Sequence, residues 1–156
     1  MLRELLNRPC LAAFAQPETD GDLLLHFAGW QPYETPMRED LLTSERGQWS
    51  LMLLSPWRLD GPTFVICDWK SVGDSSQGQE HPYLVLEGLV VEQVTLRKPG
   101  LDLLIEFSGG VRLTTLSDSA GKTDDCWYLL RPDESSIAAT HGFQLTYQKP
   151  PSDAKE

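Results

Sequence analysis

Side chains that carry out chemistry are few in this chain and far apart. The candidates are three histidines and three cysteines: His26, His81, His141, Cys10, Cys67 and Cys126. No histidine has a His, Cys or Glu neighbour at the short spacing that metal sites use. The odd number of cysteines, with no C-x-x-C pair, argues against a disulfide framework and a redox site. It predicts buried, reduced thiols.

One local cluster combines carboxylates with a thiol. Asp124 and Asp125 precede Cys126 in a stretch of Gly, Lys, Thr and Asp, which favours a solvated turn over a metal site. Residues 134–136, after Pro132 and Asp133, also have the composition of a turn. The G-x-G-x-x-G, G-x-x-x-x-G-K-[ST], H-E-x-x-H and G-x-S-x-G motifs are absent from the sequence. We therefore assign no catalytic, cofactor-binding or metal-binding residue and favour a protein that is not an enzyme.

Charge and composition narrow the classes of partner. The chain has 156 residues and a net charge of −10, which predicts one globular domain that repels phosphate backbones and anionic membranes. A basic protein partner is favoured instead. The longest apolar runs are too short for a membrane-spanning helix, and the N-terminus does not have the pattern of a signal peptide. We expect a cytoplasmic protein.

A repeated stretch indicates how the domain is organised. D-L-L-L-H-F-A-G begins at Asp22 and D-L-L-I-E-F-S-G begins at Asp102, and W-x-L-x-x-P begins at both Trp57 and Trp127. We predict a single domain over 1–147. It consists of two similar halves, about 1–70 and 81–147, joined by a linker at 71–80 and followed by a disordered tail at 148–156. The two Trp residues are expected to anchor the core.

The repeated stretch has the period of a β-strand. Leu103, Ile105 and Phe107 alternate with more polar residues and are expected to face the core. In the first half Leu23, Leu25 and Phe27 have the same role. His26 then stands where Glu106 stands, which predicts a solvated surface site for both.

The fold class that follows is β-rich α+β, with two pseudo-repeated antiparallel β half-domains, each with one short helix. The short helices are expected at 2–8 and 81–88, and 36–47 is either a third helix or a loop. A glycine turn at 108–110 should lead into a return strand. Other strands are expected at 49–55, 57–59, 63–69, 89–96, 111–116, 126–130 and 143–147. Pro56 interrupts one of these runs, which indicates a sheet edge or a bulge.

The first half carries extra residues without a counterpart in the second. They form the segment 30–49, in which Trp30, Tyr33, Met37 and Trp49 stand among prolines and charged residues. Aromatic side chains and Met in a loop are typical of protein-binding surfaces. The alternative is that these side chains fold back over the core. We predict that these four residues bind a partner.

These motifs together resemble a known group of sequences. The D-L-x-L-x-F-x-x-G stretch, the loop after it, "SPWRL" and the W-x-L motif are similar to those of small uncharacterised bacterial proteins with the same repeated half-domain. Some of these resemble the acidic immunity proteins of contact-dependent toxin systems. The similarity covers 21–30, 49–66 and 85–139 and lies in core and turn positions. The resemblance implies the fold and an immunity-type role, and it transfers no functional residue.

Three functional hypotheses follow from the sequence. The first is a non-catalytic protein-binding module, such as an immunity-type inhibitor of a basic partner. The second is a small-molecule-binding protein or enzyme with a cleft between the two halves, lined by titratable groups from both. The third, compatible with either, is a homodimer that forms through an exposed edge strand.

Overall fold

The computed structural model describes residues 2–16, 22–28, 48–70, 81–97, 101–116, 125–140 and 145–149. Strands account for 61% of these residues, and they form two antiparallel sheets. The prediction of a β-rich fold is therefore confirmed. The expected linker at 71–80 lies outside the described residues, as does most of the expected disordered tail.

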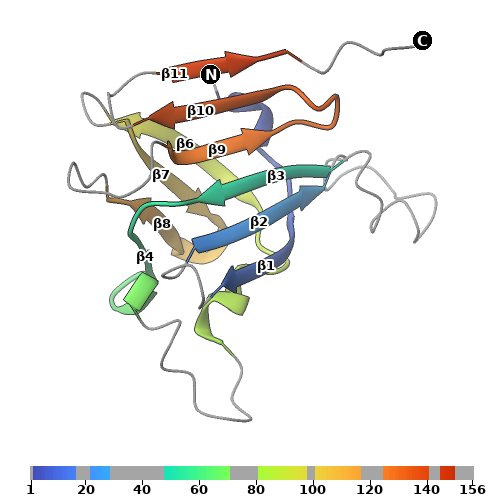
Figure 1. Cartoon of the computed structure of the whole chain (residues 1–156). Helices are drawn as coiled ribbons and strands as arrows, with labels where there is room; N and C mark the ends of the chain where they lie inside the picture. The colour runs from blue at the N-terminus through green and yellow to red at the C-terminus, as the bar shows by residue number, and fades with distance from the viewer. Residues whose placement is uncertain are drawn as a thin grey trace.

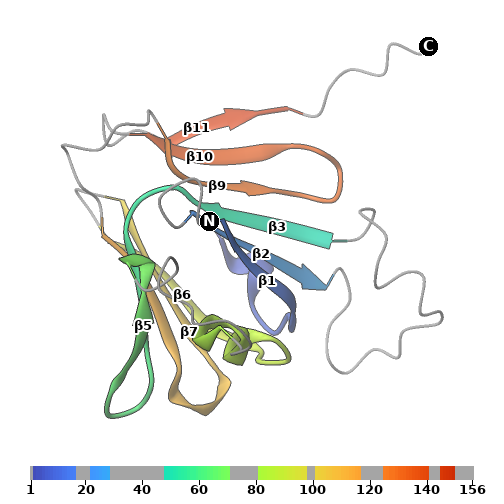
Figure 2. The ribbon, with the colours of Figure 1, turned by 60° about the horizontal axis from the view of Figure 1, so that its bottom comes forward.

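One sheet has six strands and the other has five (Figure 1). The six-stranded sheet has the order β1 (Cys10–Gln16), β2 (Asp22–Ala28), β3 (Gln48–Leu53), β9 (Asp125–Leu130), β10 (Ser136–Thr140) and β11 (Leu145–Gln148). The five-stranded sheet has the order β5 (Val65–Asp68), β4 (Trp57–Asp60), β8 (Arg112–Thr115), β7 (Asp102–Phe107) and β6 (Val91–Arg97). Figure 2 shows that the strands of the two sheets run in different directions.

The chain changes sheet in the middle of each predicted half. Strands β1, β2 and β3 belong to the six-stranded sheet, whereas β4 and β5 belong to the other. Strands β6, β7 and β8 lie in the five-stranded sheet, and β9, β10 and β11 lie in the six-stranded one. Pro56 stands at the first of these crossings. The amides of Leu54 and Ser55 just before it both donate to the carbonyl of Cys126, at 2.9 and 3.1 Å.

The two sheets meet along one side, and along the other their edge strands pair with no further strand among the residues that the structure describes. Pro9 forms a bridge with Val90, the amide of Cys10 donates to the carbonyl of Leu89, and the amide of Gly88 donates to the carbonyl of Cys10, both at 2.8 Å. These bonds join the edge at β1 to the edge at β6. The other two edges are β11 and β5.

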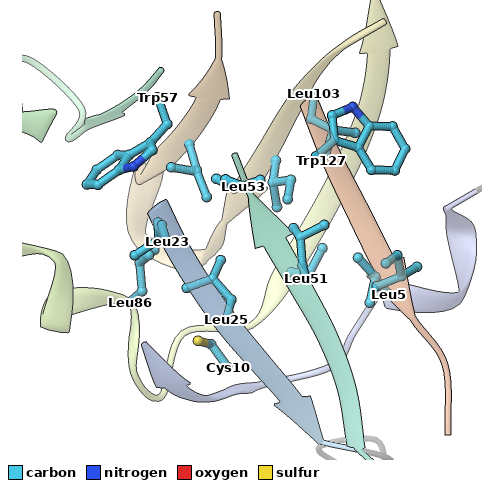
Figure 3. Close-up of a cluster of buried hydrophobic side chains, with 14 of the residues drawn as sticks. Leu5, Cys10, Leu23, Leu25, Leu51, Leu53, Trp57, Leu86, Leu103 and Trp127 are labelled. Carbon is cyan, nitrogen blue, oxygen red and sulfur yellow. The ribbon is translucent and has the colours of Figure 1, made fainter. Parts of the chain in front are cut away.

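Large apolar side chains fill the space between the sheets (Figure 3). Trp57 and Trp127 are both fully buried, as predicted. The indole Nε1 of Trp127 donates to the carbonyl of Leu101 at 2.9 Å, so its polar atom is paired inside the core. The rings of Phe27 and Phe107 stack with centroids 6.4 Å apart. The alternating residues of β2 and β7 that were expected to face the core are all buried.

The predicted helices are wrong in type and length. The segment expected to be helical at 2–8 contains only the 3₁₀ turn η1 (Arg3–Leu5), and 81–88 contains only the 3₁₀ turn η4 (Pro82–Leu86). Neither has a side-chain cap, because Leu2 and His81 at the N-cap positions make no capping hydrogen bond. Such short segments form only where tertiary packing holds them. The segment 36–47 lies outside the described residues.

Two local predictions have different outcomes. The turn at 108–110 (η5, Ser108–Gly110) is confirmed, and Gly109 and Gly110 have φ values of 80° and 78°. The turn expected at 134–136 is only partly right, because β10 begins at Ser136 and Ser135 is fully buried. The sequence analysis missed β10, whose alternation of Ile137 and Ala139 with small residues is a weak strand signal.

Candidate interaction surface

The outer face of the six-stranded sheet carries a continuous row of apolar side chains. Phe14 on β1 pairs with Leu24 on β2, Leu24 pairs with Met52 on β3, and Met52 pairs with Tyr128 on β9. Partners in an antiparallel register lie on the same face of the sheet. Their chain neighbours, such as Leu23, are buried in the core, so these four residues face outward. We call Phe14, Leu24, Met52 and Tyr128 the outer row.

The outer row is accessible to a partner. The side chain of Phe14 is 51% exposed, and Leu130, on the same face of β9, is 39% exposed. Leu24, Met52 and Tyr128 are half-buried. A single exposed apolar residue is ordinary, but a contiguous set across four strands is typical of an interaction surface.

The matching face of the five-stranded sheet has a different character. Counted from the edge where the two sheets join, strands β6, β7, β8 and β4 correspond to β1, β2, β3 and β9. The row on them that corresponds to the outer row consists of Thr95, Leu104, Thr114 and Arg58. The next row on this face contains Glu106, Arg112 and Asp60, with opposite charges side by side. A sheet of this topology therefore does not require an apolar outer face.

His26 lies beside the outer row, on the face where the sequence placed it. Its Nδ1 is 2.9 Å from the Oγ of Ser50 on β3, and its ring meets the ring of Phe14 edge-on, with centroids 5.9 Å apart. An imidazole next to a hydroxyl is the beginning of a nucleophilic site, but catalysis would also need a group that orients the imidazole and an oxyanion hole. His26 and Ser50 form a polar cross-strand pair within an apolar face.

A shallow hollow of about 250 Å³ continues this face over β9, β10 and β11. Its lining residues are Tyr128, Leu130, Ser136, Ala138, Thr146 and Gln148. None of them comes from the first predicted half, whereas the cleft hypothesis requires titratable groups from both halves. Tyr128 is the one titratable residue in this lining.

The predicted partner-binding residues are described only in part. Trp30, Tyr33 and Met37 lie outside the described residues. Trp49 on β3 is half-buried and packs against the core, with the guanidinium carbon of Arg8 5.0 Å from its ring centroid. Partner binding by these four residues stays a prediction. The sequence analysis missed the outer row, although five of the seven residues of β2 and four of the six residues of β3 are apolar, which indicates strands with two apolar faces.

The cysteine thiols lie inside the fold. Cys10, Cys67 and Cys126 are free and buried, as predicted. Burial raises the pKa of Cys10 to about 12 and that of Cys67 to about 11. A backbone hydrogen bond with Ala12 partly opposes the shift at Cys10, and the charge of Asp68 adds to the shift at Cys67. Thiols with raised pKa values are poor nucleophiles and poor metal ligands.

Two kinds of feature are absent from the described part of the chain. No group of three or more His, Cys, Asp or Glu side chains is placed to hold a metal ion there. No helix in the described ranges has the length and apolar character needed to cross a membrane.

Comparisons with protein families, with curated proteins and with solved structures found no match.

Proposed function

We propose that this chain is a non-catalytic protein-binding module that holds a basic partner against the outer row. The observation that supports this proposal is the contrast between the two sheets. Three of the four corresponding pairs differ in polarity, and the fourth is Leu in both rows. The three are Phe14 and Thr95, Met52 and Thr114, and Tyr128 and Arg58. Apolar side chains that folding does not require at these positions are best explained by contact with another molecule.

The charge of the chain supports a basic partner. The described residues include 11 acidic and 8 basic residues, a net charge of −3, so most of the total of −10 lies in the remaining segments. One of these described acidic residues, Asp22, lies on the outer face of β2, two residues from Leu24. An apolar centre within an acidic molecule suits a partner with an apolar patch rimmed by Lys and Arg. An immunity-type inhibitor of a basic toxin has these properties.

We also infer that the two halves derive from one duplicated unit. Several equivalences support this. The order β1-β2-β3-β9-β10 matches the order β6-β7-β8-β4-β5. The bond from the amide of Ala28 to the carbonyl of Pro9, at 3.0 Å, matches that from the amide of Ser108 to the carbonyl of Val90, at 2.8 Å. Under this inference the row Thr95, Leu104, Thr114 and Arg58 is the duplicated copy of the outer row, and only the outer row is apolar across all four strands.

The test compares matched variants of the two faces in a capture experiment. The purified chain is immobilised, incubated with lysate of its source organism and eluted at low and then high salt, with partners identified by mass spectrometry. We expect one stoichiometric basic partner, released by salt. The double variant Phe14→Thr and Met52→Thr should bind it at least about tenfold more weakly, because apolar contacts at the centre of an interface dominate its affinity.

The control variant carries Thr95→Ala and Thr114→Ala on the opposite face and should bind the partner as the native chain does. Circular dichroism and urea unfolding are used to check that both variants fold. Undiminished capture by the Phe14 and Met52 variant would contradict the proposal, as would a partner that is not basic.

A further inference from the structure

The two open edges of the molecule differ in how they are protected. Within the described residues, β11 pairs only with β10, and β5 pairs only with β4. An edge strand presents backbone N–H and C=O groups that another strand can pair with. Natural proteins protect such edges with charged or polar side chains, Pro and short strands.

Edge strand β11 has these protections. Thr146 and Gln148 are exposed polar residues, and Lys149 follows the strand. Tyr147 is 59% exposed, but the guanidinium carbon of Arg131 lies 5.3 Å from its ring centroid. The apolar ring is therefore covered by a cation on one side.

Edge strand β5 is less protected. Its sequence is Val-Ile-Cys-Asp, with neither Lys nor Pro. Val65 is 58% exposed, and Phe64, which precedes the strand, is 62% exposed. Two large apolar side chains thus stand next to each other at the start of this edge, and its charged residues, Asp68 and Lys70, lie at the other end.

The hairpin that carries β5 holds this edge in a defined position. The amide of Gly61 donates to the carbonyl of Phe64 at 2.7 Å. A Cβ on Gly61 would lie 3.0 Å from the Phe64 ring, so the ring packs directly on the glycine. Pro62 touches the β7–β8 turn, because a Cβ on Gly110 would lie 2.9 Å from its Cγ. An edge held in place loses little entropy when it pairs.

The net charge of this hairpin favours a second copy of the chain over a basic partner. Between Trp57 and Lys70 the charged residues are Arg58, Asp60, Asp68 and Lys70, with a net charge of zero. Arg58 and Asp60 form an ion pair, with Nε 3.0 Å from Oδ1. A basic partner would find no net attraction here, whereas a second copy of the chain would meet no local repulsion.

We propose that a second copy of this chain pairs antiparallel with β5 across a two-fold axis. The two five-stranded sheets then join into one continuous sheet, and Phe64 and Val65 of each copy pack against the other. An isologous pairing of this kind needs only one surface, used twice. The proposal goes beyond the proposed function and does not depend on it, because the outer row lies on the other sheet.

Sedimentation velocity of the full chain tests the proposal. The chain is measured from low micromolar to submillimolar concentration, at a salt concentration that screens the net charge of −10. We expect a concentration-dependent monomer–dimer equilibrium. Val65→Lys places a charge on the edge and should weaken dimerisation at least tenfold. Phe64→Glu, outside the strand, should have the same effect if Val65→Lys does not fold.

Gln148→Lys is the matched control, because it adds the same charge to the other open edge, and it should leave the dimer unchanged. A chain that remains monomeric at every concentration overturns the proposal. A dimer that survives both Val65→Lys and Phe64→Glu, or that Gln148→Lys dissociates, also overturns it. If the Phe14→Thr and Met52→Thr variant no longer dimerises, the dimer interface is the outer row, and this result also overturns the proposal. The capture experiment then decides the proposed function separately.

Discussion

Two adjacent glycines in the β7–β8 turn offer a quantitative test of how the β4–β5 hairpin is positioned. Gly109 and Gly110 have nearly the same backbone conformation, with φ values of 80° and 78°. They differ in their surroundings. A Cβ on Gly109 would have no heavy atom within 4 Å, whereas a Cβ on Gly110 would lie 2.9 Å from the Cγ of Pro62.

The expected cost of each substitution follows from this geometry. Gly109→Ala places an L residue at positive φ, which costs about 1–2 kcal/mol. Gly110→Ala has the same backbone cost. It adds an overlap with Pro62 that the structure must relieve, and overpacking costs about 1–3 kcal/mol. The difference between the two variants isolates the contact between the turn and the hairpin.

Urea unfolding of the native chain and four variants measures this contact. Gly109→Ala and Gly110→Ala are compared in the native background, and Gly110→Ala is repeated in a Pro62→Ala background. Pro62→Ala removes the Cγ atom and leaves the Cβ, which is 3.4 Å from the added Cβ. In that background the cost of Gly110→Ala should fall to that of Gly109→Ala, a coupling of about 1–3 kcal/mol.

Equal destabilisation by Gly109→Ala and Gly110→Ala would refute this reasoning, and so would the absence of coupling with Pro62→Ala. Either result would mean that the hairpin does not touch the turn as described. The position of Phe64 and Val65 would then be less defined, which would weaken the case for pairing along β5.

Two further predictions concern the core. Trp127→Phe should lower the free energy of unfolding, measured in urea, because the carbonyl of Leu101 loses its hydrogen-bond donor. This loss contributes about 1–3 kcal/mol, and lost packing adds to it. An unchanged urea midpoint would contradict this pairing. Burial raises the pKa of Cys10 from 9.0 to about 12. Iodoacetamide at pH 8.5 should therefore alkylate the Cys10 thiol at least about a hundredfold more slowly in the native chain than in urea. Since the raised pKa favours the neutral thiol in the fold, stability should fall as pH rises from about 9 towards 12, and Cys10→Ala should flatten that fall; an equal slope in the two proteins would contradict this.

The strands were the most predictable part of the molecule. The alternation of Leu103, Ile105 and Phe107 placed all three in the core correctly, because side chains on a strand alternate between two faces. The buried Trp57 and Trp127 followed from their repeated motif. The helices were predicted wrongly because a short amphipathic stretch has the same pattern whether it forms an α-helix or a single 3₁₀ turn.

The outer row could not be predicted from the sequence alone. Leu24 and Met52 are separated by a long connection, and Tyr128 belongs to the other predicted half. Their alignment depends on β3 lying beside β9, which requires the chain to change sheet after Leu53. Backbone hydrogen bonds join these strands, and such bonds leave no signature in side-chain composition.

The sequence by itself determined most of the strand segments and, for β2 and β7, which face is buried, because hydrophobic burial acts on each side chain and has a local period. It also determined the net charge and the reduced state expected of the cysteines. Only the tertiary structure decided which strands are neighbours, because pairing between distant segments is a property of the whole chain. The outer row and the position of β5 at a sheet edge both depend on that choice of neighbours, so the proposed interaction surfaces became visible only in the folded protein.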